Sequence, residues 1–471
     1  MADVDQAADA AAAAAAGFEV LGRAGRAGLL DEVADALEAE RGALVDVADR
    51  ETRLGGTRLS GELTRTCFQL RLFGDVLREG SYVEAVIDHA ADTAMGPRPD
   101  LRRMLVPVGP VAVFGASNFP LAFSVPGGDT ASALAAGCPV VVKAHPSHPA
   151  TSRRAFEVMR AVLPDGVLGL VEGYEAGASL VKHPRIRAVG FTGSTSGGRA
   201  LFDLAAARSE PIPFYGELGS LNPLIVTPGA AADRAEEIAD GFVGSMSLGN
   251  GQFCTKPGLM FVPAGADRLR SALAAAVSKL AAAPMLNDAI RDAYRAEISR
   301  REHDARLELV AAGEQGGSEL GSPALFSVAV ADLDGELLEE CFGPSALAVE
   351  YRDLDDLLSA VSRLGGQLTA SVHASDGEDE VVARLHDEIR RVAGRLIFGG
   401  YPTGVAVAWA MHHGGPFPAT TNSGHTSVGA AAVRRWLRPI CYQNAPRAVL
   451  PDELRDGNPA GIPRRVDGVL E

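Results

Sequence analysis

The chain has 471 residues, of which 44 are Lys or Arg and 60 are Asp or Glu, so its formal net charge is −16. This length allows two or three domains, and a hydrophobic content of 47% is typical of a globular protein with a sizeable core. The acidic balance argues against a nucleic-acid partner, which requires a basic face. No stretch of about 18 or more uninterrupted apolar residues occurs, so no membrane span is expected.

The N-terminal part is predicted to be helical. The alanine-rich run from Ala7 to Ala16 has no basic segment before it, so it is not expected to be a signal peptide but an exposed or partly frayed helix. Apolar residues then recur at helical spacing between residues 17 and 80. Short alternating pieces over 81–103 are compatible with a hairpin.

From Val106 onward, apolar strand-like runs alternate with helices, which predicts a doubly wound parallel sheet. A second α/β section runs from about Leu221 to Phe417. The predicted fold class is therefore α/β. The helices expected in these sections cover residues 129–136, 152–162, 177–182, 231–248 and 267–281.

The cysteines are few and widely spaced. Their number is odd and no CxxC occurs, which argues against a disulfide framework or a zinc site and fits a reducing cytoplasm. Cys254 stands out because it follows Gly249 and Gly251, which allow close approach to a reacting carbonyl carbon. A buried structural thiol is the alternative for this residue. The five cysteines are Cys67, Cys138, Cys254, Cys341 and Cys441.

Two segments place polar residues after a strand, where open α/β sheets bind ligands. In FGASNFP (114–120), the Asn118 amide could donate to a carbonyl oxygen that gains negative charge, or simply lie in a turn. In VVVKAHPSHPATS (140–152), Lys143 could bond ribose hydroxyls or phosphate. His145, Ser147 and His148 lie beside it, and a solvated loop with incidental histidines is the alternative.

Two further segments follow the same rule. In VGFTGSTSGG (189–198), glycines open a helix whose backbone N–H groups could bind phosphate, although a plain strand-to-helix turn would look similar. In FYGELGSLNP (214–223), Glu217 has an apolar setting, which predicts a raised pKa and a general base. A salt-bridged structural glutamate is the alternative there.

The remaining segments are ECFGPSA (340–346) and a Gly- and Pro-rich loop over 399–421, which is typical of a pocket lining. His412 and His413 in that loop are adjacent, a poor spacing for metal ligands, so no metal site is predicted.

Together, the motifs SNFP, FTGS, GELG, GQFCT and ECFGP resemble those of the aldehyde dehydrogenase superfamily, from about residue 17 to residue 445. KAHPSHPATS, GQFCTKPG and RRWLRPICYQNAP are similar to the α-ketoglutaric semialdehyde (2,5-dioxopentanoate) dehydrogenase branch. The resemblance implies a Rossmann-type cofactor domain over 1–218 and a catalytic domain over 219–420. It further implies an oligomerisation hairpin near 84–104, joined by the C-terminal part 421–471, in a homodimer or homotetramer.

The resemblance also implies the chemistry. Cys254 would attack the aldehyde, Asn118 and the Cys254 N–H would stabilise the oxyanion, and Glu217 would activate water. Lys143, Gly193 and Ser194 would hold the adenosine ribose and pyrophosphate of NADP or NAD, beside Gly198. Glu340 and Phe342 would contact the nicotinamide end.

Two positions depart from the pattern. Relatives that prefer NAD often carry a glutamate three residues after the lysine, where this chain has Pro146. His145, Ser147 and His148 could then donate to a 2′-phosphate, which favours NADP. Ser220 stands where many relatives have glycine, and its hydroxyl is expected to alter loop packing only.

The substrate is expected to contact the helix over 62–73, which the resemblance places beside the aldehyde tunnel. Arg65 and Gln69 are four residues apart and share a face, so they could bind the carboxylate and keto group of a dioxo acid. Phe119 is a further candidate, and a surface Arg–Glu pair is the alternative for Arg65. Other aldehydes, release of acyl-CoA, and a catalytically silent member of the fold also stay open.

Overall fold

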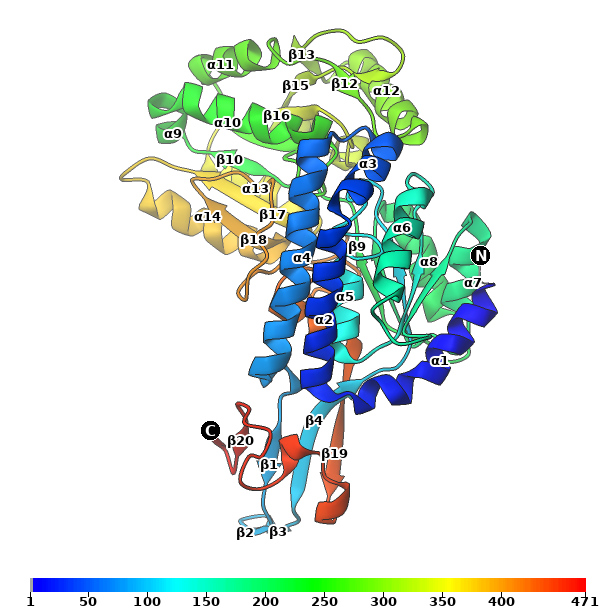
Figure 1. The fold of residues 1–471 in the computed structure, drawn as a ribbon. Coiled ribbons are helices and arrows are strands. Elements are labelled where there is room, and N and C mark those ends of the chain that lie inside the picture. Colours follow the sequence, from blue (N-terminus) through cyan, green and yellow to red (C-terminus); the bar gives the residue numbers. More distant parts are fainter. Residues whose placement is uncertain (1–2) are drawn as a thin grey trace.

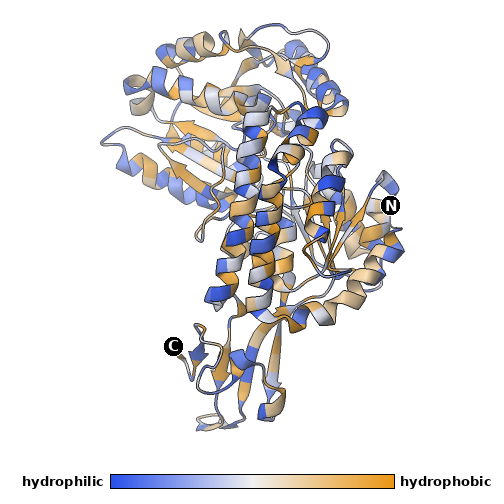
Figure 2. Ribbon diagram, in the orientation of Figure 1, coloured by the Kyte–Doolittle hydropathy of each residue, from blue (hydrophilic) through white to orange (hydrophobic). Residues whose placement is uncertain are grey.

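The computed structural model describes residues 3–471, which build three larger β-sheets and two two-stranded ones, together with helices (Figure 1). Two of the sheets are mostly parallel, and the third projects from the lower end of the molecule in Figure 1. Hydrophobic residues concentrate in the strands and on the helix faces that cover them (Figure 2). None of the described helices is both long enough and apolar enough to cross a lipid bilayer.

The first sheet has five parallel strands in the order β7-β6-β5-β8-β9. Its inner strands β5 and β6 are apolar apart from the terminal Lys143, because helices cover both faces of the sheet. The strands are β5 (Val111–Phe114), β6 (Val140–Lys143), β7 (Leu168–Val171), β8 (Ala188–Thr192) and β9 (Phe214–Glu217), and the helices between them are α5 (Gly128–Ala136), α6 (Pro149–Arg160), α7 (Tyr174–Lys182) and α8 (Thr195–Ala206).

Four N-terminal helices complete this part: α1 (Val4–Val20), α2 (Gly22–Ala39), α3 (Arg41–Thr52) and α4 (Gly56–Glu79). The prediction of a helix for the alanine run is confirmed, but the expectation that it is exposed is wrong for one face. Ala7, Ala8 and Ala11 are buried against the first sheet, and a Cβ built on Gly169 of β7 would lie 3.4 Å from the Ala7 Cβ. Small side chains allow this close packing, which hydropathy alone does not reveal.

The second sheet has seven strands in the order β13-β15-β16-β11-β10-β17-β18, and only the β13 edge pairs antiparallel. Its strands are β10 (Leu224–Val226), β11 (Leu259–Pro263), β13 (Glu308–Ala312), β15 (Ala324–Ala329), β16 (Ser345–Tyr351), β17 (Gln367–His373) and β18 (Ala393–Phe398). Beside it lies a two-stranded pair, β12 (Ala283–Pro284) and β14 (Leu320–Gly321).

The helices of this second part are α9 (Pro228–Asp233), α10 (Ala235–Ser247), α11 (Asp267–Val277), α12 (Asp288–His303), α13 (Leu354–Arg363) and α14 (Asp379–Val392). The single helix expected over 231–248 is instead two helices that meet at Arg234, whose φ and ψ are −129° and 32°. The Thr227 hydroxyl and Pro228 start α9 earlier than the apolar spacing indicates.

The third sheet joins segments that are distant in sequence, in the order β19-β4-β1-β20-β21. Its strands are β1 (Val86–Asp88), β4 (Leu101–Pro107), β19 (Leu437–Gln443), β20 (Arg465–Val466) and β21 (Val469–Leu470), with the hairpin β2 (Ala91–Thr93) and β3 (Gly96–Arg98) at its tip. Seven residues of β19 pair antiparallel with β4. The region expected to form a hairpin therefore pairs with the C-terminal part of the chain.

Candidate active site

The Cys254 loop begins with an unusual backbone turn. Gly249, Asn250 and Gly251 have φ values of 59°, 56° and 68°, all in the left-handed region. A Cβ on Gly251 would collide with the backbone carbonyl of Gly343. Glycine therefore lets the loop pack directly against the chain that follows Glu340.

Buried side chains hold the Cys254 loop in place through hydrogen bonds. The Asn222 Nδ2 donates to the carbonyl oxygens of Cys254 at 2.8 Å and Lys256 at 3.0 Å. The Gln367 Oε1 accepts from the Asn222 N–H at 3.1 Å and from the Ser220 hydroxyl at 3.0 Å. Ser220, the departure from the family pattern, is thus part of the network that fixes the position of Cys254.

Lys256 ties the same loop to the Glu340 segment. Its buried ammonium donates to the carbonyl oxygens of Cys341 at 2.7 Å and Ser345 at 2.8 Å. Burial raises the pKa of Glu340 to about 7, and the nearby Lys256 charge opposes that rise. The Glu340 carboxylate lies so close to Gly219 that a Cβ there would come within 2.8 Å of its Oε2.

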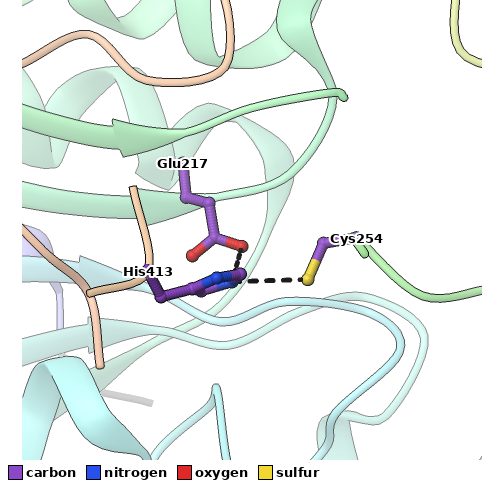
Figure 3. A group of neighbouring side chains, drawn as sticks. All are labelled: Glu217, Cys254 and His413. Carbon is purple, nitrogen blue, oxygen red and sulfur yellow. Dashed lines mark hydrogen bonds and ion pairs between the residues drawn. The ribbon is translucent and has the colours of Figure 1, made fainter. Parts of the chain in front are cut away.

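The side chains of Glu217, His413 and Cys254 lie together (Figure 3). The Glu217 Oε1 lies 2.9 Å from the His413 Nε2, and the same nitrogen lies 3.6 Å from the Cys254 Sγ. The Ser427 hydroxyl donates to the other Glu217 oxygen at 2.6 Å. A thiol, an imidazole and a carboxylate in contact form the arrangement expected of an activated nucleophile.

The electrostatics of this group differ from the expectation for Glu217. Burial raises its pKa, but contacts with His413, Ser427 and Cys254 outweigh burial, so its pKa lies below the usual value. The predicted rise is therefore wrong, because the sequence did not reveal these partners. Burial, and then the neighbouring Glu217 charge, raise the pKa of Cys254 well above its usual value. A base in contact with the thiol is needed at neutral pH.

The same three residues present one ligand atom each within 4.8 Å of one another, which a metal ion could also bridge. The expectation of no metal relied on the adjacency of His412 and His413, whereas the geometric cluster joins His413 to distant residues. The absence of a metal stays a prediction.

Asn118 lies next to the nucleophile loop. Its side-chain Nδ2 donates to the Gln252 carbonyl oxygen at 3.0 Å, and its backbone carbonyl oxygen accepts from the Arg58 guanidinium at 2.7 Å. The Phe119 ring contacts the Phe253 ring edge-on at a centroid separation of 5.2 Å. Asn118 and Phe119 therefore contact Gln252 and Phe253, the two residues that precede Cys254.

The candidate cofactor residues lie at the carboxyl ends of β6 and β8. Gly193 and Ser194 are exposed, and the Ser194 hydroxyl accepts from the Gly197 N–H to cap α8. Lys143 is half-buried, and burial lowers its pKa. Gly198 is buried, and a Cβ there would collide with Leu218, so its role is close packing of α8.

The histidines after Lys143 are less available than the sequence indicates. His148 is fully buried, with its Nε2 2.8 Å from the Ala116 carbonyl oxygen. Burial lowers the pKa of His145 to about 3, so its ring is neutral at physiological pH. The Ser147 hydroxyl accepts from the Asn287 amide at 2.9 Å. The loop is therefore held in place by hydrogen bonds to Ala116 and Asn287.

The two substrate candidates on α4, Arg65 and Gln69, lie in different surroundings. The Arg65 guanidinium lies over the Phe123 ring at 5.0 Å and donates to the Val405 carbonyl oxygen at 3.5 Å. Gln69 is buried against α5, where a Cβ on Gly128 would lie 2.6 Å from its Nε2. Arg65 thus contacts the 399–421 loop, while Gln69 packs between helices.

Sequence reasoning missed His413, Ser427 and Arg58 as site residues. The signal for His413 was a histidine in a Gly- and Pro-rich loop, a setting that could have suggested catalysis as readily as a metal. Ser427 and Arg58 gave no signal, because their partners lie far away in sequence.

Known proteins share this architecture. The model of the aldehyde dehydrogenase family matches residues 1–416. Alpha-ketoglutaric semialdehyde dehydrogenase 2 of Azospirillum brasilense is 46% identical over 100% of this chain and 92% of its own length. The alpha-ketoglutaric semialdehyde dehydrogenase of Acinetobacter baylyi is 45% identical over 99% of this chain and 91% of its own length.

Solved structures agree on the fold. Aldehyde dehydrogenase C of Pseudomonas syringae, solved as a mutant with NAD+ and octanal, has a TM-score of 0.79 at 23% identity. The match covers 95% of this chain and 90% of that one. The contact between Cys254 and His413, the two α/β parts and these matches agree, and the chain belongs to the aldehyde dehydrogenase family.

Proposed function

We propose that this aldehyde dehydrogenase oxidises 2,5-dioxopentanoate, the semialdehyde of 2-oxoglutarate, to 2-oxoglutarate. The names of the two relatives at 45–46% identity support the substrate. The contact of the Cys254 Sγ with the His413 Nε2, which in turn contacts Glu217, supports the reaction.

In the first half-reaction, the His413 Nε2 passes its hydrogen to the Glu217 carboxylate and accepts the proton of the Cys254 thiol, because this one ring nitrogen faces both groups. The thiolate attacks the aldehyde carbon to form a thiohemiacetal, and Glu217 releases its proton to solvent before the second half-reaction. The Asn118 amide and the Cys254 N–H donate to the developing oxyanion. A bound nicotinamide cofactor supplies the acceptor for the hydride, and a thioester remains on Cys254.

In the second half-reaction, Glu217 activates a water molecule that hydrolyses the thioester. Its pKa lies below the usual value because of His413 and Ser427, so the carboxylate is ionised and able to accept a proton. A retained general base favours hydrolysis over transfer of the acyl group to coenzyme A.

The residues at the edge of the first sheet fit a nicotinamide dinucleotide. The exposed start of α8 offers backbone N–H groups to the pyrophosphate, and Lys143 offers a cation to the ribose or its phosphate. Glu340 would bind the nicotinamide ribose beside Gly219, and Phe342 would lie against the nicotinamide. Pro146 still favours NADP, with Lys143 rather than the buried histidines as the partner of the 2′-phosphate.

We also propose that the third sheet mediates a homodimer or homotetramer. Its outer strands expose Val469 and Leu470, at 67% and 68% of their accessible surface, and the β2–β3 tip exposes Met95 at 97%. A small sheet of this kind is stabilised when it pairs with another subunit. The free cysteines support a reducing, cytoplasmic location.

The test follows NADPH and NADH formation at 340 nm with purified protein. We expect 2,5-dioxopentanoate to be oxidised faster than succinic semialdehyde and simple aliphatic aldehydes, and Cys254→Ala to abolish the activity. Activity only on other aldehydes would retain the mechanism and reject the substrate. No activity on any aldehyde, with intact cofactor binding, would indicate a catalytically silent member of the fold.

A further inference from the structure

Two arginines from different parts of the chain converge on one loop near the nucleophile. Arg65 comes from α4, and Arg395 comes from β18 of the second sheet. The Arg65 Nη2 donates to the Val405 carbonyl oxygen, and the Arg395 Nη1 donates to the neighbouring Gly404 carbonyl oxygen at 3.2 Å. The two guanidinium groups therefore lie against consecutive peptide groups.

Neither guanidinium has a carboxylate partner. The Arg65 Nη1 and the Arg395 Nε are buried and have no hydrogen-bond partner among residues 3–471. The carboxylate nearest to Arg65 along α4, Glu62, is bonded instead to the backbone N–H groups of Leu121 and Ala122 at 2.8 and 2.9 Å. The loop over 399–421 contains no Asp or Glu.

One buried N–H group of each guanidinium is left without an acceptor, while the Arg395 Nη2 donates to the Pro402 carbonyl oxygen. A buried N–H without an acceptor lowers stability, and an anion bound there would remove that cost. Surface arginines of the same chain differ, as Arg391 shows by pairing with Glu388 at 2.8 Å. Burial lowers the pKa of both Arg65 and Arg395; the Glu62 charge, and then a charge on Cys254, oppose the shift of Arg65, and a charge on Cys254 opposes the shift of Arg395, so both guanidinium groups lie within electrostatic reach of Cys254.

We propose that Arg65 and Arg395, which both donate to carbonyl oxygens of the 402–405 segment, together bind the carboxylate of the substrate. The inference builds on the proposed function and changes the expected substrate contacts. Arg395, rather than Gln69, is now the expected second substrate contact beside Arg65, because Gln69 packs against α5. A guanidinium offers paired N–H donors that match a carboxylate, so the two residues select aldehydes that carry a terminal acid group.

The test compares Arg395→Gln, Arg65→Gln and the double variant on 2,5-dioxopentanoate and on pentanal, which has the same number of carbons and no charge. Each single change is expected to lower kcat/KM for the acid about 10- to 100-fold, mainly through KM, because a hydrogen bond to a charged group is lost. Activity on pentanal should change less than about threefold, which also reports that the variant is folded. Arg391→Gln is the matched control and should behave as the wild type.

The outcomes separate three cases. An equal loss on both substrates would mean that the arginines only hold the loop, and an unchanged preference for the acid would mean that they do not bind it; either result overturns the inference while the proposed function stands. A wild-type enzyme with no preference for acid-bearing aldehydes would overturn the proposed substrate as well. Arg395→Lys should retain part of the preference, because it keeps the charge without the paired donors.

Discussion

The two parallel sheets face the site with opposite ends of their strands, and these ends are built differently. The strand ends of the first sheet form what we call the open edge of the site, and those of the second sheet form the closed edge. The first sheet presents the carboxyl ends of its strands, where Gly193 and Ser194 are exposed and Lys143 is half-buried. The second sheet presents the amino ends of β10, β11 and β17, where Asn222 and Gln367 are buried and hydrogen-bonded. The open edge suits a cofactor that enters and leaves, and the closed edge suits a nucleophile that keeps its position.

The largest effect is expected at the closed edge, from His413→Ala. Removing the base in contact with Cys254 should lower kcat/KM about 10²- to 10⁴-fold. Because burial raises the pKa of the thiol, the residual rate should rise with pH through the alkaline range. A pH–rate profile measures this, with His412→Ala as the control. A flat profile or near-normal activity would show that the histidine does not accept the proton.

Glu217→Gln should separate the two half-reactions. Loss of a general base is expected to slow turnover about 10²-fold or more, whereas the first hydride transfer should be less affected. Rapid mixing should then reveal a burst of reduced cofactor followed by slow release of acid. Equal slowing of burst and turnover would assign Glu217 to the first step alone.

Gln367→Ala tests whether the closed edge depends on its buried network. Its Oε1 accepts from the Ser220 hydroxyl and the backbone N–H groups of Leu221 and Asn222. Leaving these donors unpaired should lower the free energy of unfolding by about 1–3 kcal/mol. Denaturant unfolding measures this, and the exposed Gln315→Ala is the control. Two variants of equal stability would contradict the network.

At the open edge, Lys143→Met should affect binding rather than stability. We expect the KM for the cofactor to rise about tenfold, because one charged hydrogen bond is lost. The free energy of unfolding should change by less than about 0.5 kcal/mol. Steady-state kinetics with NADP and NAD check the first statement, and thermal unfolding without cofactor checks the second. A large loss of stability would make the lysine part of the fold.

The smallest expected effect concerns the preference for NADP over NAD, which should not grow as the pH falls. Because the pKa of His145 is lowered to about 3, its ring stays neutral between pH 5.5 and pH 8.5. The ratio of kcat/KM for NADP to that for NAD should therefore not rise as the pH falls through the usual histidine range, about 6.5. A preference for NADP that grows below that pH would show that the histidine becomes charged beside the phosphate.

The sequence predicts the strand–helix alternation of both parallel sheets, because buried parallel strands are apolar throughout and helices have a clear period. Cys254, Glu217 and Asn118 could be predicted as site residues because each follows or precedes a recognisable turn, and their catalytic roles stay predictions. His413 was not predicted as a site residue, because it lies 196 residues after Glu217 and contacts that residue only in the folded chain. The buried face of α1 escaped prediction because an alanine run has no contrast between its two sides.

The short helical turn over Ala430–Trp436 completes the packing of α5, which lies in the first third of the chain. The Arg435 guanidinium pairs with Asp129 at 2.7 Å across 306 residues of sequence, and the Trp436 indole donates to the Ser132 hydroxyl at 2.8 Å. During synthesis, α5 and β4 emerge long before these partners exist. Part of the interior of the early half therefore stays uncovered until Arg435 and Trp436 have emerged.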